Sequence, residues 1–163
     1  MHDCYKIIID SPIGHLCISA TSSEITSLEF TELECATPSY IPPVLHQCVT
    51  ELNEYFDGKR KHFTVSLNPQ GTNFQKEVWN ELLKVPFGKT CSYMHIALQL
   101  NNLGAVRAVG SANGKNRIAI IIPCHRIIGE NGKLTGYAGG LNRKRWLLEH
   151  ELKLSDANSN LLF

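Results

Sequence analysis

Residues 92–113 read SYMHIALQLNNLGAVRAVGSAN, and this stretch predicts two short helices joined by a tight turn. Apolar side chains recur at helical spacing over about Ser92–Leu100 and again over about Ala105–Asn113. Between them, Asn101–Gly104 supplies the asparagines and glycine that are typical of turns. Helix, glycine-containing turn and helix is the helix-turn-helix pattern. The second helix has small side chains, from which Arg107 projects, so its backbone can lie close against another surface.

An apolar, β-branched run at Ile118–Ile122 follows this motif and predicts a buried strand. Pro123 ends the strand, and Cys124 and His125 come directly after it. A thiolate is the reactive form of cysteine, and a nearby imidazole can lower the thiol pKa enough to populate it. The pair is therefore a candidate nucleophile and base. The alternative is that Cys124 is a small buried hydrophobic residue, as most single cysteines are.

Cys124 and His125 are not assured of direct contact, because neighbours on an extended strand point to opposite sides. A bridging water can join them. The base in such a site usually has a third group that orients it. The last predicted helix, about Leu141–Leu154, carries Glu149 and Glu151 as candidates for this role. The residues alone do not choose between the two glutamates, which also suit an ordinary solvated helix face.

The segment between His125 and the last helix predicts a hairpin followed by a loop. Ile127–Ile128 and Lys133–Leu134 flank an Asn-Gly pair at 131–132, which is a tight hairpin turn sequence. Residues 136–140 read GYAGG and predict a flexible loop. Residues 155–163 are expected to form a flexible tail.

The first half of the chain predicts a small sheet with one helix, which serves as a scaffold. Pro43 suits the first turn of a helix that continues at helical spacing to Phe56. Ser11–Gly14 is a turn signature between two strands. The expected strands are Tyr5–Asp10, His15–Ala20 and Ile25–Phe30, with His62–Leu67 as a candidate fourth strand.

Asn68–Gly71 is the best candidate linker between two domains. Directly after it, Thr72 and Gln75 form a capping box at the start of a helix. We therefore expect an α+β protein with a scaffold domain at residues 1–68 and a mainly helical domain at residues 72–154.

The composition is that of a folded globular protein. The 163 residues are 43% apolar and 19% charged, which argues against disorder. No apolar run is long enough to span a membrane, and the first residues lack the pattern of a secretion signal. Six cysteines without a Cys-x-x-Cys pair favour reduced thiols over disulfides. These features predict a cytoplasmic protein.

Charge is distributed unevenly between the two halves. Residues 1–71 hold 4 Lys and Arg against 9 Asp and Glu, whereas residues 72–163 hold 12 against 6. A basic half that carries the candidate nucleophile predicts an anionic partner, with nucleic acid as the leading choice. The alternative is an ordinary scatter of surface lysines.

Several motifs, in order and at matching spacing, resemble the O6-alkylguanine-DNA alkyltransferase family. The likeness is close over residues 72–153 and looser in the first half. The motifs are Arg107–Gly110, Asn116, Pro123–Arg126, Tyr137–Gly140 and Trp146–Glu151, with Asp10–Gly14 in the first half. The resemblance implies a ribonuclease H-like N-terminal domain and a C-terminal domain of the winged-helix or helix-turn-helix type.

The resemblance also implies a direct repair reaction. Such a protein binds double-stranded DNA as a monomer, flips out a guanine with an O6-alkyl group, and moves that group irreversibly onto its own cysteine. It needs no cofactor, and it works in the bacterial cytoplasm and nucleoid. Whether O4-alkylthymine is also a substrate, and which alkyl size is preferred, stay open.

The family pattern assigns the chemical roles residue by residue. Cys124 is the acceptor, and His125 takes its proton through a water. Glu151, which lies five residues past Trp146, orients the histidine in preference to Glu149. Further catalytic residues are Asn116, which braces the active-site turn, and Tyr93, which donates to the base.

The same pattern assigns the contacts with DNA and with the flipped base. Arg107 is the finger that fills the gap left by the flipped base. The expected DNA-binding residues are Arg107, Ala108, Gly110, Arg126 and Tyr93, and the expected base pocket comprises Tyr137, Ala138 and Pro123.

Two features depart from patterns seen in some members of the family. Ala138 replaces a serine, so that only the backbone amide is left to contact the lesion oxygen. Cys4 aligns with one ligand of a structural zinc, but Thr21 and Thr26 occupy the positions of two others, and we therefore expect no metal.

Three other functions compete with this interpretation. A lesion-binding protein of the alkyltransferase-like type would lack the cysteine, which is present here as Cys124. A Cys-His-Glu hydrolase would need an oxyanion hole and a substrate cleft. A winged-helix regulator would need a regulatory segment that this chain does not offer.

Overall fold

The computed structural model describes residues 3–35 and 37–159 and divides the chain into two compact units. The first unit comprises Met1–Gln70 and Arg117–Ile121, and the second comprises Gly71–Asn116 and Ile122–Phe163. Residues 117–121 thus group with the first unit, although they lie inside the range 72–154 expected for the second domain.

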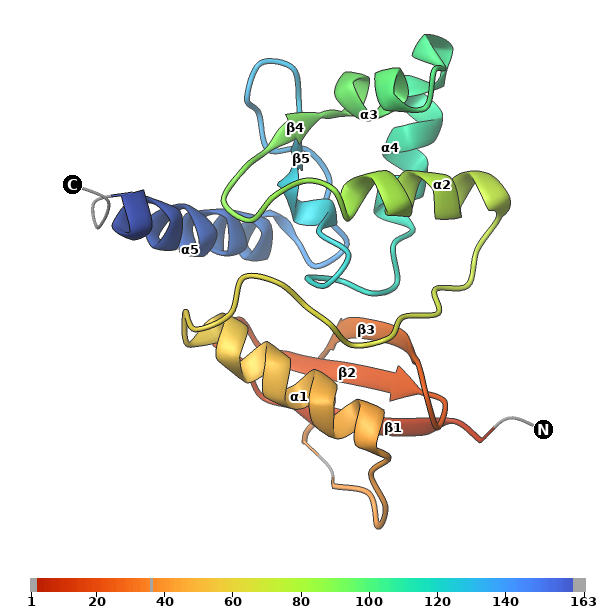
Figure 1. The fold of residues 1–163 in the computed structure, drawn as a ribbon, viewed down its shortest axis with the longest axis vertical. Coiled ribbons are helices and arrows are strands. Elements are labelled where there is room, and N and C mark those ends of the chain that lie inside the picture. The colour runs from red at the N-terminus through yellow and green to blue at the C-terminus, as the bar shows by residue number, and fades with distance from the viewer. Residues whose placement is uncertain (1–2, 36, 160–163) are drawn as a thin grey trace. The chain divides into compact units, whose positions relative to one another are not determined.

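The first unit is built on a three-stranded antiparallel sheet in the order β1-β2-β3, with one helix packed against β2 and β3 (Figure 1). Leu16 and Ile18 of the sheet are fully buried, as are Leu45 and Leu52 of the helix, and these side chains form the core of the unit. The elements are β1 (Tyr5–Ile9), β2 (His15–Ala20), β3 (Ile25–Thr31) and α1 (Pro43–Phe56), close to the predicted ranges.

Residues 62–67 do not form the candidate fourth strand, and Leu67 makes only an isolated bridge with Ile25. The buried carboxylate of Glu51 explains the difference. It accepts hydrogen bonds from the backbone N–H of Thr64 at 3.0 Å and of Val65 at 3.2 Å. These amides are therefore satisfied by a side chain instead of by a neighbouring strand.

The apolar run at residues 118–122 is also not a strand. Ile118 makes an isolated bridge with Leu28, and the chain then turns, with the Ile121 N–H donating to the Ala119 carbonyl at 2.8 Å. Ile120 lies in the left-handed region at φ 71°, which is a strained conformation for a β-branched residue. The residues are apolar because they are buried. A short apolar stretch indicates burial but does not by itself predict a β-strand.

The second unit begins with α2 (Asn73–Leu82) and contains the predicted helix-turn-helix motif, α3 (Tyr93–Gln99), η1 (Leu103–Ala105) and α4 (Val106–Gly114). The predicted capping box of α2 is confirmed. Thr72 Oγ1 accepts from the Gln75 N–H at 3.1 Å, and Gln75 Oε1 accepts from the Thr72 N–H at 2.9 Å. The indole N–H of Trp79 donates to the Ala112 carbonyl at 2.9 Å and ties α2 to α4.

Two short strands, β4 (Cys91–Ser92) and β5 (Ile127–Ile128), pair in parallel in this unit. The predicted hairpin is therefore only partly correct. Its turn exists, since the Gly132 N–H donates to the Gly129 carbonyl at 2.9 Å, but residues 133–134 form no strand. β5 pairs with β4 instead, which joins the chain after Cys124 to the start of the helix-turn-helix motif.

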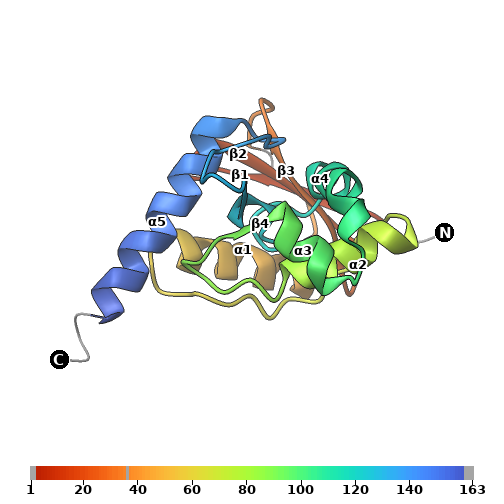
Figure 2. The same ribbon diagram turned by 90° about the horizontal axis from the view of Figure 1, so that it is seen from above.

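The last helix, α5 (Leu141–Ser159), is longer than predicted. It continues through residues 155–159 of the expected tail, and residues 160–163 lie outside the described part of the chain. Figure 1 shows α5 on the opposite side of the unit from α4, with β4 and β5 between them, and Figure 2 shows β4 between the same two helices. Side chains from α4 and α5 can therefore approach the segment at Cys124 from two directions.

Candidate active site

Cys124 lies in a single 3-10 turn, η2 (Cys124–Arg126), and not on an extended strand. The turn is closed by hydrogen bonds from the Cys124 N–H to the Ile122 carbonyl, at 2.8 Å, and from the Arg126 N–H to the Pro123 carbonyl, at 3.0 Å. The cysteine is only 5% exposed. The expectation that Cys124 and His125 lie on an extended strand is therefore wrong.

Two asparagines, one in the last turn of α4 and one just after the helix, hold the backbone around Cys124. Asn116 donates to the Ile122 carbonyl at 2.9 Å and also hydrogen-bonds the thiol, so it lies where the bracing role requires. Asn113 donates to the Cys124 carbonyl at 3.4 Å, a contact that the sequence analysis missed. The spacing of three residues, which places both amides on one side of a helix end, is the signal that could have revealed it.

The structure brings Glu151, and not Glu149, to His125. His125 Nε2 and Glu151 Oε1 are 2.7 Å apart, and both side chains are buried, whereas Glu149 is exposed. Burial works against the ionised form of Glu151, but hydrogen bonds from His125 and Arg126 outweigh it and hold the pKa of the carboxyl well below its usual range. Glu151 is therefore a carboxylate that orients the imidazole.

The charge on Glu151 also determines the tautomer of His125. An ionised carboxylate can only accept hydrogen bonds, so His125 must donate from Nε2. The other ring nitrogen, Nδ1, then carries a lone pair and can accept a proton. Burial lowers the pKa of His125, although Glu151 opposes this, so the resting imidazole is neutral.

Arg126 does not take the DNA-binding place expected for it. Its guanidinium is buried, with Nε 2.9 Å from Glu151 Oε2 and Nη2 2.9 Å from Glu151 Oε1. Nη1 donates to the Val85 carbonyl at 2.7 Å, and the guanidinium lies over the Phe87 ring. A side chain engaged on all its nitrogens inside the unit supports the site and cannot reach a phosphate.

The resting thiol of Cys124 is protonated. Burial raises its pKa above the ordinary value, while the hydrogen bond from Asn116 and the positive charge of Lys144 act in the opposite direction. The expectation that a neighbouring imidazole simply populates the thiolate is thus incomplete. A proton must leave the thiol during the reaction, which makes the neutral Nδ1 of His125 the natural acceptor.

Lys144 is a buried lysine of α5 that the sequence analysis did not identify. Its ammonium donates to the carbonyls of Ile127 at 2.6 Å, Thr135 at 2.7 Å and Gly136 at 3.4 Å. It therefore fastens the loop before Tyr137 to β5 and supplies positive charge near Cys124. A lysine among charged residues of a helix predicts a solvated face, and we see no signal that distinguishes this one.

The residues expected to form the base pocket surround the acceptor turn in part. Pro123 precedes Cys124 in the turn and is buried, and Tyr137 lies near enough for the charge of the Cys124 thiolate to help burial raise the pKa of its phenol. Ala138 is exposed in the next loop position. The Tyr93 hydroxyl is 3.0 Å from Thr135 Oγ1, which links the start of α3 to the same loop.

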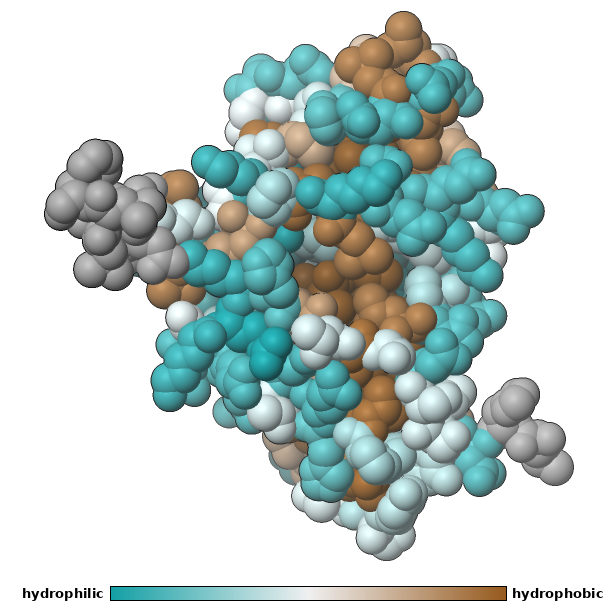
Figure 3. Space-filling view, in the orientation of Figure 1, coloured by the Kyte–Doolittle hydropathy of each residue, from teal (hydrophilic) through white to brown (hydrophobic). Residues whose placement is uncertain are grey.

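The outer face of α4 presents the residues expected at DNA. Arg107 and Ala108 are exposed, whereas Gly110 is half-buried, and a Cβ there would lie 3.8 Å from the Tyr93 ring. Leu98 of α3 and Leu103 of η1 are exposed in the same motif, and Figure 3 shows apolar atoms gathered at the top of the molecule. The helix α4 itself carries small side chains with one long cationic side chain, Arg107.

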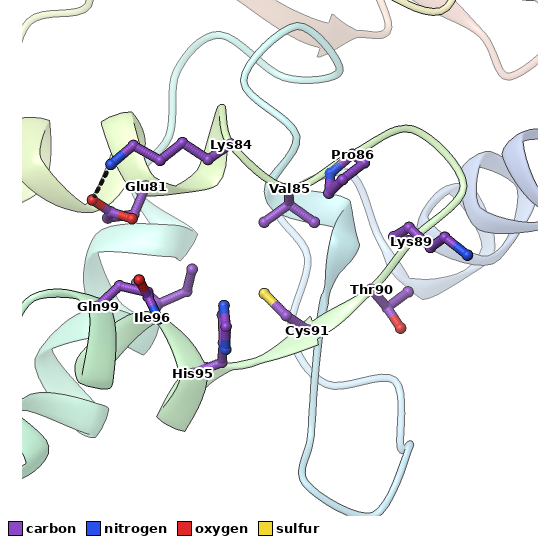
Figure 4. A pocket seen from close by; sticks show the side chains of 10 residues that line it. All are labelled: Glu81, Lys84, Val85, Pro86, Lys89, Thr90, Cys91, His95, Ile96 and Gln99. Atoms are coloured by element: carbon purple, nitrogen blue, oxygen red, sulfur yellow. Dashed lines mark hydrogen bonds and ion pairs between the residues drawn. The ribbon is translucent and has the colours of Figure 1, made fainter.

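A second cysteine and histidine pair lies in a pocket lined by the end of α2, β4 and α3 (Figure 4). Cys91 and His95 point into this pocket, and Glu81 is occupied by Lys84 at 2.7 Å. Burial raises the pKa of Cys91 to about 11, so its thiol is protonated at neutral pH. Among the described residues no carboxylate orients the His95 ring as Glu151 orients His125, so Cys91 is a matched control for Cys124.

Among the described residues, no group of three or more His, Cys, Asp or Glu side chains is placed to hold a metal ion. Within the same residues, no helix is both long and apolar enough to cross a lipid bilayer.

The chain matches two protein families, which together cover most of its length. Residues 73–153 match the 6-O-methylguanine DNA methyltransferase, DNA binding domain, and residues 4–69 match the 6-O-methylguanine DNA methyltransferase, ribonuclease-like domain. The expected α+β fold, with a ribonuclease-like first half and a DNA-binding second half, is confirmed.

Similar proteins occur in bacteria and archaea. The methylated-DNA–protein-cysteine methyltransferase of Mycobacterium bovis is 49% identical over 158 residues, covering 94% of this chain and 95% of the relative. The protein of that name from Methanosarcina barkeri is 43% identical, covering 90% and 96%.

Solved structures agree with these relatives. The O6-methylguanine methyltransferase of Mycobacterium tuberculosis superposes with a TM-score of 0.86 at 46% identity, covering 99% of this chain and 100% of the other. The Mycobacterium tuberculosis OGT in complex with DNA gives 0.82 at 49% identity, covering 90% and 92%. On this likeness over nearly its whole length, the chain belongs to the 6-O-methylguanine DNA methyltransferase family.

Proposed function

We propose that this protein repairs alkylated DNA directly, by moving the alkyl group from O6 of a guanine onto Cys124. The observation that carries the proposal is the buried contact of 2.7 Å between His125 and Glu151. It lies directly beside Cys124, in a turn whose Ile122 and Cys124 carbonyls each accept a hydrogen bond from an asparagine. Family membership supplies the substrate class, because the relatives are named for transfer from methylated DNA to a protein cysteine.

The transfer begins with a proton. The Cys124 S–H bond breaks, and its proton reaches Nδ1 of His125 through a water, leaving a thiolate and an imidazolium. Glu151 stabilises the imidazolium through Nε2, and Arg126 keeps Glu151 ionised throughout. Because both the thiol and the base are buried, the charges form only as the reaction proceeds.

The thiolate then attacks the alkyl carbon. A C–S bond forms as the C–O6 bond breaks, and the guanine leaves with the electron pair on its oxygen. The Tyr93 hydroxyl, held beside Thr135, donates to the leaving base and eases its departure. The backbone amides near Tyr137 and Ala138 face the lesion oxygen in this proposal. The product thioether is a poor leaving group, so each molecule reacts once.

The substrate base has to leave the DNA stack before it can meet the buried Cys124. Arg107 projects from the exposed face of α4 and fills the gap, while Ala108 lets the helix backbone approach the groove. The protein acts as a monomer on double-stranded DNA. It works where the chromosome is, which in a bacterium is the cytoplasm.

The test is mass spectrometry after incubation with a duplex that contains O6-methylguanine. The protein should gain one methyl group, located on Cys124 by peptide mapping, in an amount equal to the active protein. Cys124→Ala should abolish the gain and keep DNA binding, and Cys91→Ala should react normally. Lesion binding without a mass gain would favour a recognition protein, and release of repaired DNA far beyond one equivalent would exclude a single-turnover transferase.

A further inference from the structure

Two buried polar atoms near Cys124 have no hydrogen-bond partner among the described residues. They are the side-chain oxygen of Asn113, Oδ1, and the ring nitrogen Nδ1 of His125. Asn113 is 4% exposed and His125 is fully buried. Nearly all buried polar groups in native proteins are hydrogen-bonded, so such atoms require an explanation. Their location at Cys124 suggests one connected with the reaction.

The orientation of the Asn113 amide follows from its contact with the acceptor turn. Nδ2 lies 3.4 Å from the Cys124 carbonyl, which belongs to the peptide bond that joins Cys124 to His125. The reverse orientation would place two acceptors against each other. Oδ1 is therefore the unpartnered end of the amide, and it can only accept.

The set of groups around Cys124 matches the needs of one water molecule. The thiol can donate one hydrogen bond, and Asn113 Oδ1 and His125 Nδ1 can each accept one. A buried water typically makes two to four hydrogen bonds to otherwise unsatisfied groups. One water that accepts from the thiol and donates to both acceptors would satisfy all three.

We propose that Asn113 is a positioning residue for the proton transfer: its nitrogen holds the Cys124 carbonyl, and its oxygen binds the water that carries the thiol proton to His125. The inference rests on the proposed function and assigns one more residue to it. With one water proton held on Asn113, the other points at Nδ1. As that proton moves to the imidazole, the thiol proton replaces it, so the water is regenerated and a thiolate and an imidazolium remain.

The location of Asn113 on α4 gives this role a further consequence. Arg107 leaves the exposed face of the same helix, six residues earlier. The helix that carries Arg107 therefore also carries the amide that orders the proton path.

The experiment measures the pH dependence of Cys124 alkylation by iodoacetamide, followed by peptide mass spectrometry. This reagent needs neither DNA nor an alkylated base, so the result decides the role of Asn113 even if the unmodified protein fails to take an alkyl group from DNA. Transfer from O6-benzylguanine is measured in parallel.

Asn113→Leu removes both ends of the amide, and it should raise the midpoint pH of Cys124 alkylation by about one unit, as loss of one hydrogen bond to a charged group implies. Transfer from O6-benzylguanine near neutral pH should fall by about tenfold for the same reason. Asn113→Asp keeps the shape but adds negative charge beside the thiolate, so its midpoint should rise further.

Asn80→Leu, at an exposed position of α2, is the matched control and should leave both measurements unchanged. If Asn113→Leu and Asn113→Asp fold and keep the original midpoint, the proposal is wrong. A loss of rate that is equal at every pH would likewise overturn it, since that is the result of a purely structural role. The Asp variant keeps the volume of asparagine and so keeps the test decisive if the Leu variant does not fold.

Discussion

Glu151 binds Arg126 through both carboxylate oxygens and shares one of them, Oε1, with His125. The guanidinium is a permanent cation, so the carboxylate stays ionised whether or not the imidazole carries a second proton. The arrangement separates two tasks. Arg126 compensates the buried charge of Glu151, and Glu151 remains available to stabilise a charge that appears on His125 only during the reaction.

Replacing Glu151 by Gln should slow alkyl transfer by about 100-fold, because the amide stabilises the imidazolium far less than a carboxylate does. The same change leaves the buried Arg126 without its partner and should lower the free energy of unfolding by about 3 kcal/mol. Single-turnover transfer from a free alkylated base and urea unfolding measure the two effects. Glu149→Gln, at an exposed position, should change neither.

Arg126→Met separates the structural role of Glu151 from its chemical role. It should lower stability but keep the contact between His125 and Glu151, so transfer should fall less than in Glu151→Gln. If both variants lose transfer equally, Glu151 acts only through the fold.

The rate of Cys124 alkylation by iodoacetamide, a reagent that consumes the thiolate, should rise with pH and continue to rise past pH 9.0, the ordinary pKa of the thiol. Burial raises the pKa of Cys124, so the thiolate fraction is still growing there. Transfer from a free alkylated base should instead level off by neutral pH, because burial lowers the pKa of His125 below its ordinary 6.5 and the neutral imidazole takes the thiol proton during the reaction. An iodoacetamide rate that stops rising well below pH 9.0 would contradict the raised pKa of Cys124. Lys144→Met should move the profile to higher pH, because the lysine charge favours the thiolate.

Arg107→Ala should reduce repair of duplex DNA by about 10-fold to 100-fold, since base flipping costs a few kcal/mol and the arginine stabilises the flipped state. Transfer from O6-benzylguanine needs no flipping and should stay near normal. Rapid-quench kinetics on both substrates checks the difference. Lys76→Gln removes one charge from an exposed site on α2 and should affect neither. Equal losses on duplex and free base would mean that Arg107 supports the fold.

Glu51 should make the first unit sensitive to acid. Burial opposes its ionisation, but hydrogen bonds from Thr64, Gln47 and Val65 outweigh this and lower its pKa from 4.5. A carboxyl with a lowered folded-state pKa stabilises the fold above its unfolded-state pKa, and this contribution disappears as the pH falls through the folded value. Glu51→Gln should therefore cost about 1–3 kcal/mol at neutral pH and progressively less in acid.

Urea unfolding at neutral pH and below pH 4.5 measures this difference. Glu54→Gln, at the partly exposed partner of Arg60, is the control and should show a much smaller effect. A cost for Glu51→Gln that does not shrink in acid would mean that shape, and not charge, is what Glu51 contributes.

The sequence was sufficient for features that depend on local chemistry. The capping box of Thr72 and Gln75, the helix-turn-helix spacing and the turn after Gly129 follow from short-range rules, and the structure contains them. The family pattern also selected Glu151 over Glu149, which composition and spacing did not.

Features that depend on long-range contacts were not predictable in the same way. Arg126 follows the acceptor in a basic half, which suggests a surface cation, and only the fold shows that Val85 and Glu151 enclose it. Lys144 faces three carbonyls that come from two other segments. Residues 118–122 are apolar because they are buried. A buried turn and a buried strand select the same apolar residues, so composition does not distinguish them.

Gly88 has no reactive side chain, yet its position restricts which residues the chain can carry there. Its φ is +76°, and a Cβ there would stand 1.8 Å from the Ser155 hydroxyl and 3.3 Å from the Glu151 carbonyl of α5. A side chain at position 88 would require Ser155 of α5 to shift, and any shift of the helix would carry with it the carboxylate that orients His125. Substitutions of Gly88 should therefore misalign Glu151 and His125. We expect them to lower the rate of alkyl transfer more than the free energy of unfolding.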